Sequence, residues 1–309
     1  MTIAVSTKNL SKDFKGNHAV DRLNIEVPEG SIYGFLGPNG AGKTTTLKML
    51  TGMIEPSSGD IEIFGEKVIF GHQNFHNDIG FLPDVPGFYD WMSAKEYLLF
   101  CGSLYHIDKK ESLNRTNDLL TLVGLTKQSN KKIGSYSRGM KQRLGIAQAL
   151  INKPKIIFLD EPVSALDPIG RKEVIEIIGS LAGKVTVFFS THILSDIEKI
   201  CDRIIIIKDG KALLEDSIEN IRKMSQSRDI EIEFDNGGLS KLEHLIKEVP
   251  WVESYQSSHN KIVVKVLNLD KGREELIKII ASNQLIIKKF LVFEPTLEDI
   301  FMKVVSNHA

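Results

Sequence analysis

The nine residues GPNGAGKTT, from Gly37 to Thr45, match the pattern G-x-x-x-x-G-K-[ST]. A short apolar run, Ser31–Leu36, leads into them, and Lys43–Thr51 continues with helical spacing. Glycine lets the backbone bend tightly and turn its N–H groups inward. Together with the first turn of the following helix, those groups form a positive cradle for phosphate. The pattern therefore predicts a strand–loop–helix unit that holds the phosphates of a nucleotide.

Three side chains of this loop have predicted roles of their own. Lys43 would bridge the β- and γ-phosphates of ATP, the Thr44 hydroxyl would hold Mg²⁺, and Thr45 would bond on the α-phosphate side. ATP and Mg²⁺ are therefore the predicted cofactors. The loop residues predicted to bind them are Gly37, Pro38, Asn39, Gly40, Ala41, Gly42, Lys43, Thr44 and Thr45.

A second apolar strand, IIFLDEP at residues 156–162, ends in two carboxylates. A parallel strand buried on both faces presents its carboxyl end to the ligand crevice. Asp160 would hold Mg²⁺ through water, and Glu161 would act as general base on the attacking water. On its own the segment also fits a strand end followed by a solvated acidic turn. The phosphate loop elsewhere in the chain favours the functional interpretation.

A third strand, FFSTH at residues 188–192, ends in His192. The residues alone leave two interpretations open for this side chain. It is either a surface histidine at a helix N-terminus or a hydrogen-bonding partner of the γ-phosphate.

Strands alternate with helices over residues 156–207, with helices predicted at Gly170–Leu181 and Ile193–Ile200, which indicates a parallel sheet covered on both faces. The first 36 residues alternate as strands. Between these regions, three consecutive segments with helical spacing predict an inserted helical lobe over about residues 88–152. The three segments are Ala94–Leu104, Glu111–Val123 and Arg138–Asn152.

A polar stretch at Met224–Arg228 predicts a boundary, with an ATPase domain over residues 1–224 and an accessory domain over residues 225–309. Beyond the boundary the order strand, helix, strand, strand, helix, strand predicts a small α+β ferredoxin-like domain. A terminal helix is predicted over Thr296–Val305. Residues 221–309 hold 13 Lys and Arg against 13 Asp and Glu, so this part is not expected to dock nucleic acid by charge.

The whole chain of 309 residues has a net charge of −1, which gives no general attraction for nucleic acid or anionic lipid. Cys101 and Cys201 lie in apolar stretches without metal-binding spacing and are expected to be small buried hydrophobes. The N-terminus lacks the pattern of a signal peptide. No apolar run approaches the ~20 residues that cross a bilayer, so we expect a soluble protein that reaches a membrane only through a partner.

Five segments, taken in order and spacing, resemble the nucleotide-binding subunits of ABC transporters over roughly residues 3–220. The resemblance implies an α/β phosphate-loop NTPase fold, with a RecA-like core, an antiparallel β subdomain and a helical lobe. It also implies ATP hydrolysis that drives a transporter. The segments are GPNGAGKTT, YSRGMKQR at 136–143, IIFLDEP, SALD at 164–167 and STH at 190–192.

The resemblance implies a head-to-tail dimer with two ATP molecules between its subunits. Ser137 and Gly139 would contact the γ-phosphate held by the opposite copy, as a helix N-terminus offered to an anion. Asp167 would help to couple the two sites, and His192 would polarise the γ-phosphate. Phe14 lies where the family places an aromatic residue that stacks on adenine. A core phenylalanine on a strand is the other interpretation of Phe14.

Two positions depart from the family pattern. Arg138 and Met140 replace the common glycine and glutamine, whereas the phosphate-contacting serine and glycine are kept. Asp84, in IGFLPD at 79–84, stands where the family has a glutamine that reaches Mg²⁺ and the lytic water. Aspartate is shorter but still offers oxygen to a cation. A metal ligand and a solvated loop acid both remain open for Asp84.

The segment FEPTLEDIFMKV at 293–304 resembles the tail of exporter ATPase subunits, for which the membrane-spanning permease is a separate chain. This implies a peripheral protein at the cytoplasmic face of the membrane. A coupling helix of the permease would dock near Asp84–Tyr97, a stretch with several aromatic residues, although packing of the lobe also explains many of them. The transported substrate and the direction of transport are not encoded in these motifs.

Two alternatives were weighed against the exporter subunit. A non-transport ABC ATPase that acts on nucleic acid or the ribosome usually carries paired ATPase units, a coiled coil or zinc cysteines, and none occurs in this sequence. A non-hydrolysing regulatory subunit would be expected to lack some of the catalytic residues, and Lys43, Asp160, Glu161 and His192 are all present.

Overall fold

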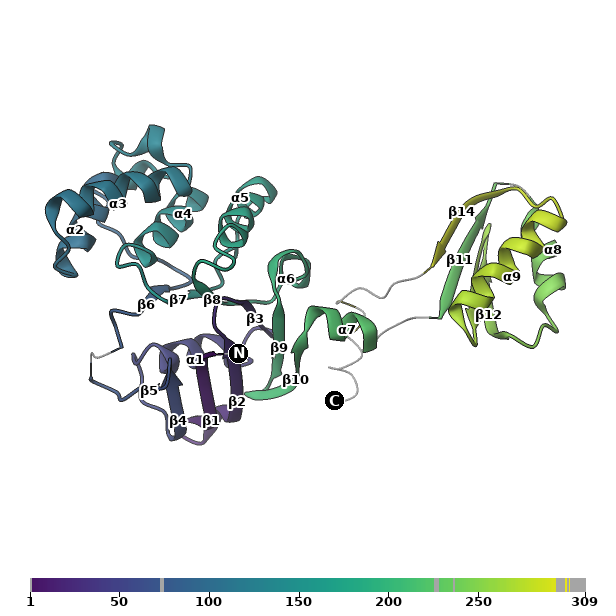
Figure 1. Cartoon of the computed structure of the whole chain (residues 1–309), viewed down its shortest axis with the longest axis horizontal. Helices are drawn as coiled ribbons and strands as arrows, with labels where there is room; N and C mark the ends of the chain where they lie inside the picture. Colours follow the sequence, from purple (N-terminus) through teal and green to yellow (C-terminus); the bar gives the residue numbers. More distant parts are fainter. Residues whose placement is uncertain are drawn as a thin grey trace. The chain divides into compact units, whose positions relative to one another are not determined.

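The computed structural model describes residues 2–72, 75–224, 228–235 and 237–292, together with residues 298 and 300. The chain forms two compact units, and the division falls between Glu219 and Asn220, within helix α7 (Ile218–Met224) (Figure 1). Each unit has its own hydrophobic core, so each is described by itself below. Nearly all of the predicted terminal helix, Thr296–Val305, lies outside the described residues.

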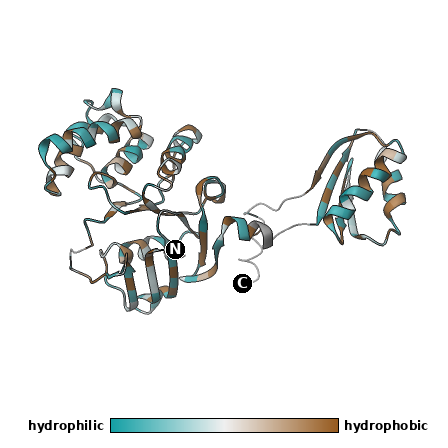
Figure 2. Cartoon of the chain, in the orientation of Figure 1, coloured by the Kyte–Doolittle hydropathy of each residue, from teal (hydrophilic) through white to brown (hydrophobic). Residues whose placement is uncertain are grey.

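The first unit is built on a central sheet with the strand order β10-β9-β3-β8-β7-β6. Neighbouring strands are parallel except for β10, which runs antiparallel to β9 at the edge. Every residue of β3, β7 and β8 is buried, as expected for parallel strands covered on both faces, and Figure 2 colours these strands largely as hydrophobic. The bounds are β3 Ile32–Leu36, β6 Ile79–Leu82, β7 Ile156–Asp160, β8 Thr186–Thr191, β9 Arg203–Lys208 and β10 Lys211–Ser217.

This strand register determines where the functional segments meet. Leu36 pairs with Thr191, and Asp160 pairs with Ser190, so β3, β7 and β8 end side by side. The loop after each of these strands therefore starts at the same edge of the sheet. The glycine-rich loop, the acidic pair and His192 are brought together there from distant parts of the sequence.

A second sheet, with the order β2-β1-β4-β5, is antiparallel and packs on the same core. Helix α1 (Lys43–Leu50) contributes Leu47, Met49 and Leu50 to this core. At its centre the Phe188 ring stacks on Tyr33, with 5.4 Å between centroids, and contacts the Phe158 ring at 5.7 Å. The bounds are β1 Ile3–Phe14, β2 Asn17–Pro28, β4 Ser58–Ile63 and β5 Glu66–Lys67.

The predicted helical lobe consists of α2 (Ala94–Leu104), α3 (Lys109–Leu122) and α4 (Arg138–Ala149), with short 3-10 turns at Thr126–Gln128 and Ile133–Ser135. Side chains set the helix starts: Ser93 and Glu96 form a capping box on α2, and Asp108 caps α3. Helix α3 therefore begins two residues before the predicted Glu111. Helix α4 ends at Ala149 rather than at Asn152, because a turn follows ahead of Pro154.

Helices α5 (Pro168–Gly179) and α6 (Leu194–Ile200) follow β7 and β8. The prediction began α5 at Gly170, which was two residues late, because Asp167 caps the helix and Pro168 occupies its first position. The observed sheets and helices confirm the predicted α/β phosphate-loop fold with an antiparallel β subdomain and a helical lobe. In the part of the chain that the structure describes, no helix combines the length and apolarity needed to cross a bilayer.

The second unit has the element order β11, α8, β12, β13, α9, β14, as predicted from the sequence. Its antiparallel sheet has the order β12-β13-β11-β14, the arrangement of a ferredoxin-like domain. Helices α8 and α9 share a core with the sheet through residues such as Ile232, Val264 and Leu276. The bounds are β11 Asp229–Phe234, α8 Gly238–Ile246, β12 Val252–Ser258, β13 Lys261–Val266, α9 Leu269–Ser282 and β14 Ile287–Val292.

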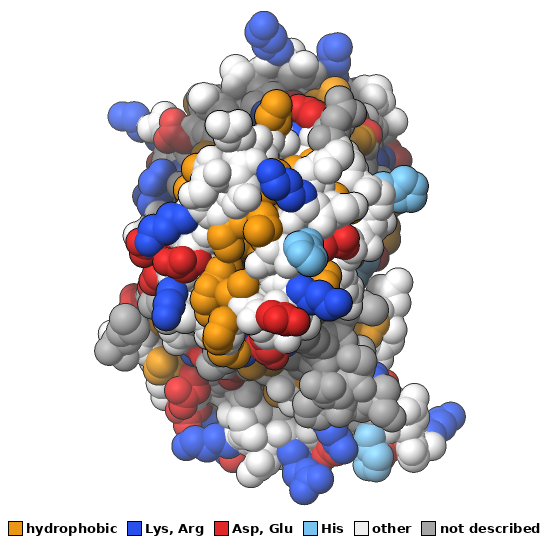
Figure 3. All heavy atoms as spheres, turned by 90° about the vertical axis from the view of Figure 1, so that its right-hand side faces the viewer, with side chains coloured by type: hydrophobic (Ala, Val, Ile, Leu, Met, Phe, Trp, Pro, Cys, Tyr) orange, Lys and Arg blue, Asp and Glu red, His pale blue; other side chains and the backbone are white. Residues whose placement is uncertain are grey.

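Opposite charges alternate across this small sheet. Glu231 on β11 lies 3.5 Å from the Lys261 ammonium on β13 and 3.1 Å from that of Lys289 on β14. The pKa of Glu231 is lowered, chiefly by its hydrogen bond with Lys289. On the different face that Figure 3 presents, acidic and basic side chains surround a run of hydrophobic ones. Among the described residues of this sheet, charges of both signs therefore lie side by side.

Candidate nucleotide-binding site

Steric contacts require glycine at two positions of the phosphate loop. A Cβ atom on Gly37 would lie 2.6 Å from the carbonyl oxygen of Ile207. One on Gly42, which has a φ of 101°, would lie 2.4 Å from the carbonyl oxygen of Ala19. The loop therefore passes directly against β9 and the start of β2, and α1 begins immediately after Gly42. This packing fixes the backbone N–H groups at the start of the helix.

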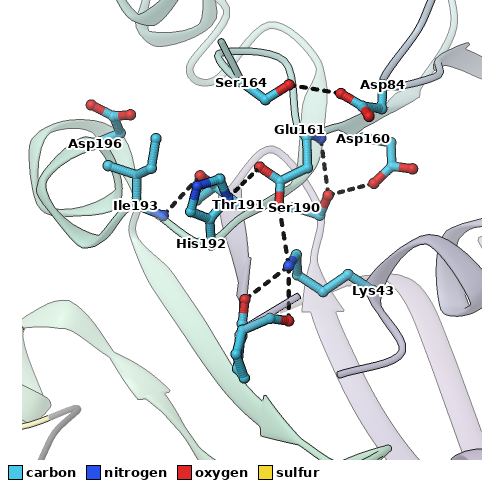
Figure 4. Close-up of polar contacts among 12 residues, drawn as sticks. Lys43, Asp84, Asp160, Glu161, Ser164, Ser190, Thr191, His192, Ile193 and Asp196 are labelled. Atoms are coloured by element: carbon cyan, nitrogen blue, oxygen red, sulfur yellow. Dashed lines mark hydrogen bonds and ion pairs between the residues drawn. The ribbon is translucent and has the colours of Figure 1, made fainter. Parts of the chain in front are cut away.

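Lys43 folds back over this loop and is almost fully buried, with 6% of its surface exposed. Its ammonium nitrogen donates to the carbonyl oxygens of Gly37 at 2.8 Å and Pro38 at 3.2 Å. It also lies 3.1 Å from Oε1 of Glu161. A buried ammonium is stable only with such partners, so the positive charge is held at the mouth of the loop and matched by one carboxylate (Figure 4).

Glu161 connects Lys43 to His192. Its Oε1 faces the Lys43 ammonium, and its Oε2 lies 3.0 Å from Nδ1 of His192. The backbone of Glu161 adopts a φ of 48°, a left-handed conformation that costs energy for a residue with a side chain and is often found at functional sites. The three side chains come from α1, the end of β7 and the end of β8. The structure thus connects three predicted site residues, Lys43, Glu161 and His192, by an ion pair and a hydrogen bond.

Asp160 is held by a residue that the sequence analysis did not single out. The Ser190 hydroxyl donates to Oδ1 of Asp160 at 2.7 Å and accepts from the Glu161 N–H at 3.0 Å. Burial raises the pKa of Asp160, and hydrogen bonds from Ser190 and Thr44 oppose that rise. The sequence analysis included Ser190 only as part of the family motif STH and gave it no role of its own. The available signal was a hydroxyl residue near the end of a fully buried strand that pairs with the acidic strand.

Asp84 lies beside this acidic pair. Its Oδ1 accepts from the Ser164 hydroxyl at 2.7 Å, and its charge contributes to the raised pKa of Asp160. A groove of about 530 Å³ is lined by Asp84, Asp160 and Thr44, together with apolar residues of the segment that follows β6. The sequence left two interpretations of Asp84 open, a metal ligand and a solvated loop acid. The structure gives Asp84 a protein partner, and it lies next to the oxygens that Mg²⁺ would require.

The remaining predicted residues lie on other segments. Ser137 caps α4, accepting from the Met140 N–H at 3.3 Å, and Asp167 caps α5 in the same way through Gly170. Gly139 lies in the first turn of α4. Among the described residues, no hydrogen bond joins Ser137 or Gly139 to residues 37–45 of the same chain. Phe14 ends β1 and is 49% exposed, so it is not a core residue.

The residues present fit a magnesium nucleotide. Mg²⁺ in proteins takes one or two carboxylates together with hydroxyl and phosphate oxygens, and it keeps several waters. Thr44, at the start of α1, and Asp160 line the same groove. The helix N-terminus and the Lys43 ammonium supply positive charge for phosphates beside them. Fold and site together define the class of phosphate-loop NTPases.

Comparison with known proteins identifies the family within this class. Residues 20–164 match the ABC transporter family, and residues 217–305 match the C-terminal domain of DrrA1-3-like ATP-binding proteins. The chain is 39% identical over 302 residues to the uncharacterized ABC transporter ATP-binding protein YxlF of Bacillus subtilis, covering 97% of this chain and 99% of the relative. It is also 39% identical over 309 residues to the bacitracin transport ATP-binding protein BcrA of Bacillus licheniformis, covering 99% of each chain.

Solved structures agree with this assignment. The ATP-binding cassette MJ0796, in a dimeric post-hydrolysis state bound to ADP and Pi, superposes with a TM-score of 0.63 at 26% identity. The superposition covers 69% of this chain and 98% of the MJ0796 chain. The chain therefore belongs to the ATP-binding subunits of ABC transporters and is an ATPase of that family. The resemblance inferred from the five motifs is confirmed.

Proposed function

We propose that the chain binds Mg·ATP at Gly37–Thr45 and hydrolyses it with Glu161 as general base, as the ATPase subunit of an exporter. The observation that carries this proposal is the pair of contacts that Glu161 makes, with the Lys43 ammonium through one oxygen and with His192 through the other. It contains the cation that a triphosphate needs, a candidate base and a second polar partner. In this proposal residues 1–224 form the ATPase domain, and residues 225–309 form an accessory domain.

The chemistry follows from the contacts of these side chains. The Lys43 ammonium would exchange the Glu161 carboxylate for β- and γ-phosphate oxygens, which are stronger and more numerous acceptors. Glu161 would then be free to orient a water molecule and take its proton, and His192 would hydrogen-bond the γ-phosphate. Thr44 and Asp160 would hold Mg²⁺, which neutralises phosphate charge when bound. Asp84 is a further candidate on the metal side, and Phe14 offers an exposed ring to adenine.

ATP-dependent dimerisation is part of the proposal. The N-terminus of α4, with Ser137 and Gly139, is the positive end of a 12-residue helix and suits a γ-phosphate held by a second copy. Asp167 caps α5 nearby, since a Cβ atom added to Gly139 would lie 3.8 Å from Cα of Gly170 and 3.9 Å from the Leu166 side chain. Support comes from the dimeric state of the MJ0796 cassette. Each active site would then be completed by the second subunit.

Gly139 allows a specific test of the dimer. A Cβ atom there meets other atoms only at 3.8 Å or more, so a side chain fits. Gly139→Asp adds a negative charge that an isolated helix N-terminus tolerates but that repels a γ-phosphate. We expect the variant to bind ATP as a monomer and to lose ATP-dependent dimerisation in light scattering, with turnover reduced at least about tenfold. Gly139→Ala is the matched control and should still dimerise. An ATP-bound dimer of the aspartate variant would contradict the trans contact.

The segment after β6 is the proposed docking site for a separate membrane-spanning permease. Val85, Tyr89 and Trp91 are 76%, 48% and 66% exposed, and the Tyr89 and Trp91 rings lie 6.0 Å apart. Other aromatic residues of the segment pack inward, as Phe88 does against Tyr97. Val85 lines the 530 Å³ groove at the start of this segment, and the exposed Tyr89 and Trp91 rings beyond it offer an apolar surface that suits a partner helix. Docking there would hold the chain at the cytoplasmic face of the membrane.

Relatives named for bacitracin transport support export of peptide antibiotics as the proposed activity. Trp91→Asp is expected to move most of the chain from the membrane fraction to the soluble fraction of its own cells. It should also make the cells as sensitive to bacitracin as a deletion strain. Ile286→Asp, at a position 73% exposed in the second unit, is the control and should change neither result. Retention of Trp91→Asp at the membrane would refute the docking site. Unchanged sensitivity of the deletion strain would refute only the cargo class.

A further inference from the structure

Asp84 is the point at which three segments of the first unit meet. It follows β6 and begins the segment that carries the exposed aromatic pair. Its backbone carbonyl accepts from the Gln142 side-chain amide of α4 at 3.0 Å. Its carboxylate accepts from the Ser164 hydroxyl at 2.7 Å, and Figure 4 shows the two side chains pointing toward each other. Ser164 lies in the loop between Glu161 and Asp167.

Pro162 and Val163 anchor the start of that loop by burial, whereas its second half is strained and has few hydrogen bonds. Glu161 and Ala165 have φ values of 48° and 50°, so two residues with side chains adopt the unfavourable left-handed conformation. Its internal backbone hydrogen bonds are Ser164 N–H to the Glu161 carbonyl at 3.0 Å and a longer one, at 3.4 Å, from Leu166 to Val163. In the described part of the chain, the bond to Asp84 is the one hydrogen bond that ties residues 162–166 to another segment.

We propose that Asp84 is a positioning residue that fixes the Glu161–Asp167 loop through Ser164, and so sets the assembly of the ATP-dependent dimer. The inference rests on the proposed function, because it needs Asp167 to face a second copy. It differs from a metal-ligand role, since a ligand acts through its charge whereas this role needs only a hydrogen-bond acceptor. It also differs from a contact that merely stabilises the fold, because dimer assembly is a separate readout.

The test uses the full-length chain in a Glu161→Gln background, which removes hydrolysis as a variable. Ser164→Ala and Asp84→Ala are measured alone and together for the ATP concentration that half-assembles the dimer at saturating Mg²⁺. Each single variant is expected to raise this half-assembly ATP concentration about tenfold, which corresponds to the loss of one hydrogen bond to a charged group. The double variant should be no worse than the poorer single variant, because both remove the same bond. Thermal melts of each variant check that the fold persists.

Conservative variants separate the two roles of Asp84. Asp84→Asn still accepts a hydrogen bond and Ser164→Thr still donates one, so both are expected to dimerise like the Glu161→Gln parent. Asp78→Asn is a matched control, since it removes another carboxylate next to β6 that is paired with Lys155 at 2.9 Å. Two outcomes would overturn the inference: additive losses in the double variant, or an Asp84→Asn variant as poor as Asp84→Ala. A Glu161→Gln parent that binds ATP but never dimerises would instead overturn the proposed dimer, and this inference with it.

Discussion

Replacing Glu161 with glutamine is expected to lower ATP turnover about 1,000-fold, within the range for loss of a general base. Glutamine has nearly the same shape, and its carbonyl oxygen can still accept from the Lys43 ammonium, which lies 3.1 Å from Oε1 in the native chain. The site should therefore keep its geometry and still bind ATP. What is lost is the ability of the side chain to take a proton from water.

Steady-state phosphate release measures this effect, and equilibrium ATP binding is measured on the same preparation. Glu176→Gln is the matched control, because Glu176 is an exposed carboxylate on α5 whose partner Lys172 is 3.7 Å away. The control should keep native turnover. If Glu161→Gln hydrolysed ATP at the native rate, the assignment of the base would be wrong.

Replacing Lys43 with alanine is expected to weaken Mg·ATP binding roughly 100-fold, which corresponds to two charge-assisted hydrogen bonds to phosphate at about 1.5 kcal/mol each. Lys43 is 6% exposed, so on binding ATP its ammonium exchanges the Glu161 carboxylate, rather than a full hydration shell, for phosphate oxygens. Its removal also leaves the Glu161 carboxylate without its cationic partner, in a site that then repels a triphosphate.

Isothermal titration with Mg·ATP measures the loss, and thermal unfolding without nucleotide shows whether the fold survives. Lys67→Ala is the matched control, since Lys67 is also ion-paired, with Asp60, but is 61% exposed on β5. It should bind ATP as the native chain does. Native affinity in Lys43→Ala would mean that the loop is not the phosphate site.

The sequence was sufficient to place the loop, the acidic pair and His192 at the ends of apolar strands, although the residues alone left two interpretations of His192 open. Parallel strands end at a common edge, so the order of strands and helices already implies that these segments meet. The ferredoxin-like unit was predicted for a similar reason: its alternating burial pattern, as in β11 and β13, is local. Helix starts were less accurate, because Asp108 and Asp167 act as caps outside the apolar pattern.

The pairings across the site could not be predicted in this way. Ser190 contacts Asp160 over 30 positions and Ser164 contacts Asp84 over 80, so neither bond leaves a periodic signal along the chain. The contact of Lys43 with Glu161 depends on the order in which β3, β8 and β7 lie in the sheet. The trans roles of Ser137, Gly139 and Asp167 involve a second copy and remain predictions from the family pattern.

The central claim is that one site, made of the Lys43 loop and the Glu161 strand, both holds Mg·ATP and cleaves it. Its most direct test is a single-turnover experiment with the purified chain in excess over γ-labelled ATP. The native chain is predicted to convert the bound ATP to ADP and phosphate, whereas Glu161→Gln should retain the same nucleotide uncleaved. Bound ATP left intact by the native chain, or cleaved equally fast by Glu161→Gln, would contradict the claim.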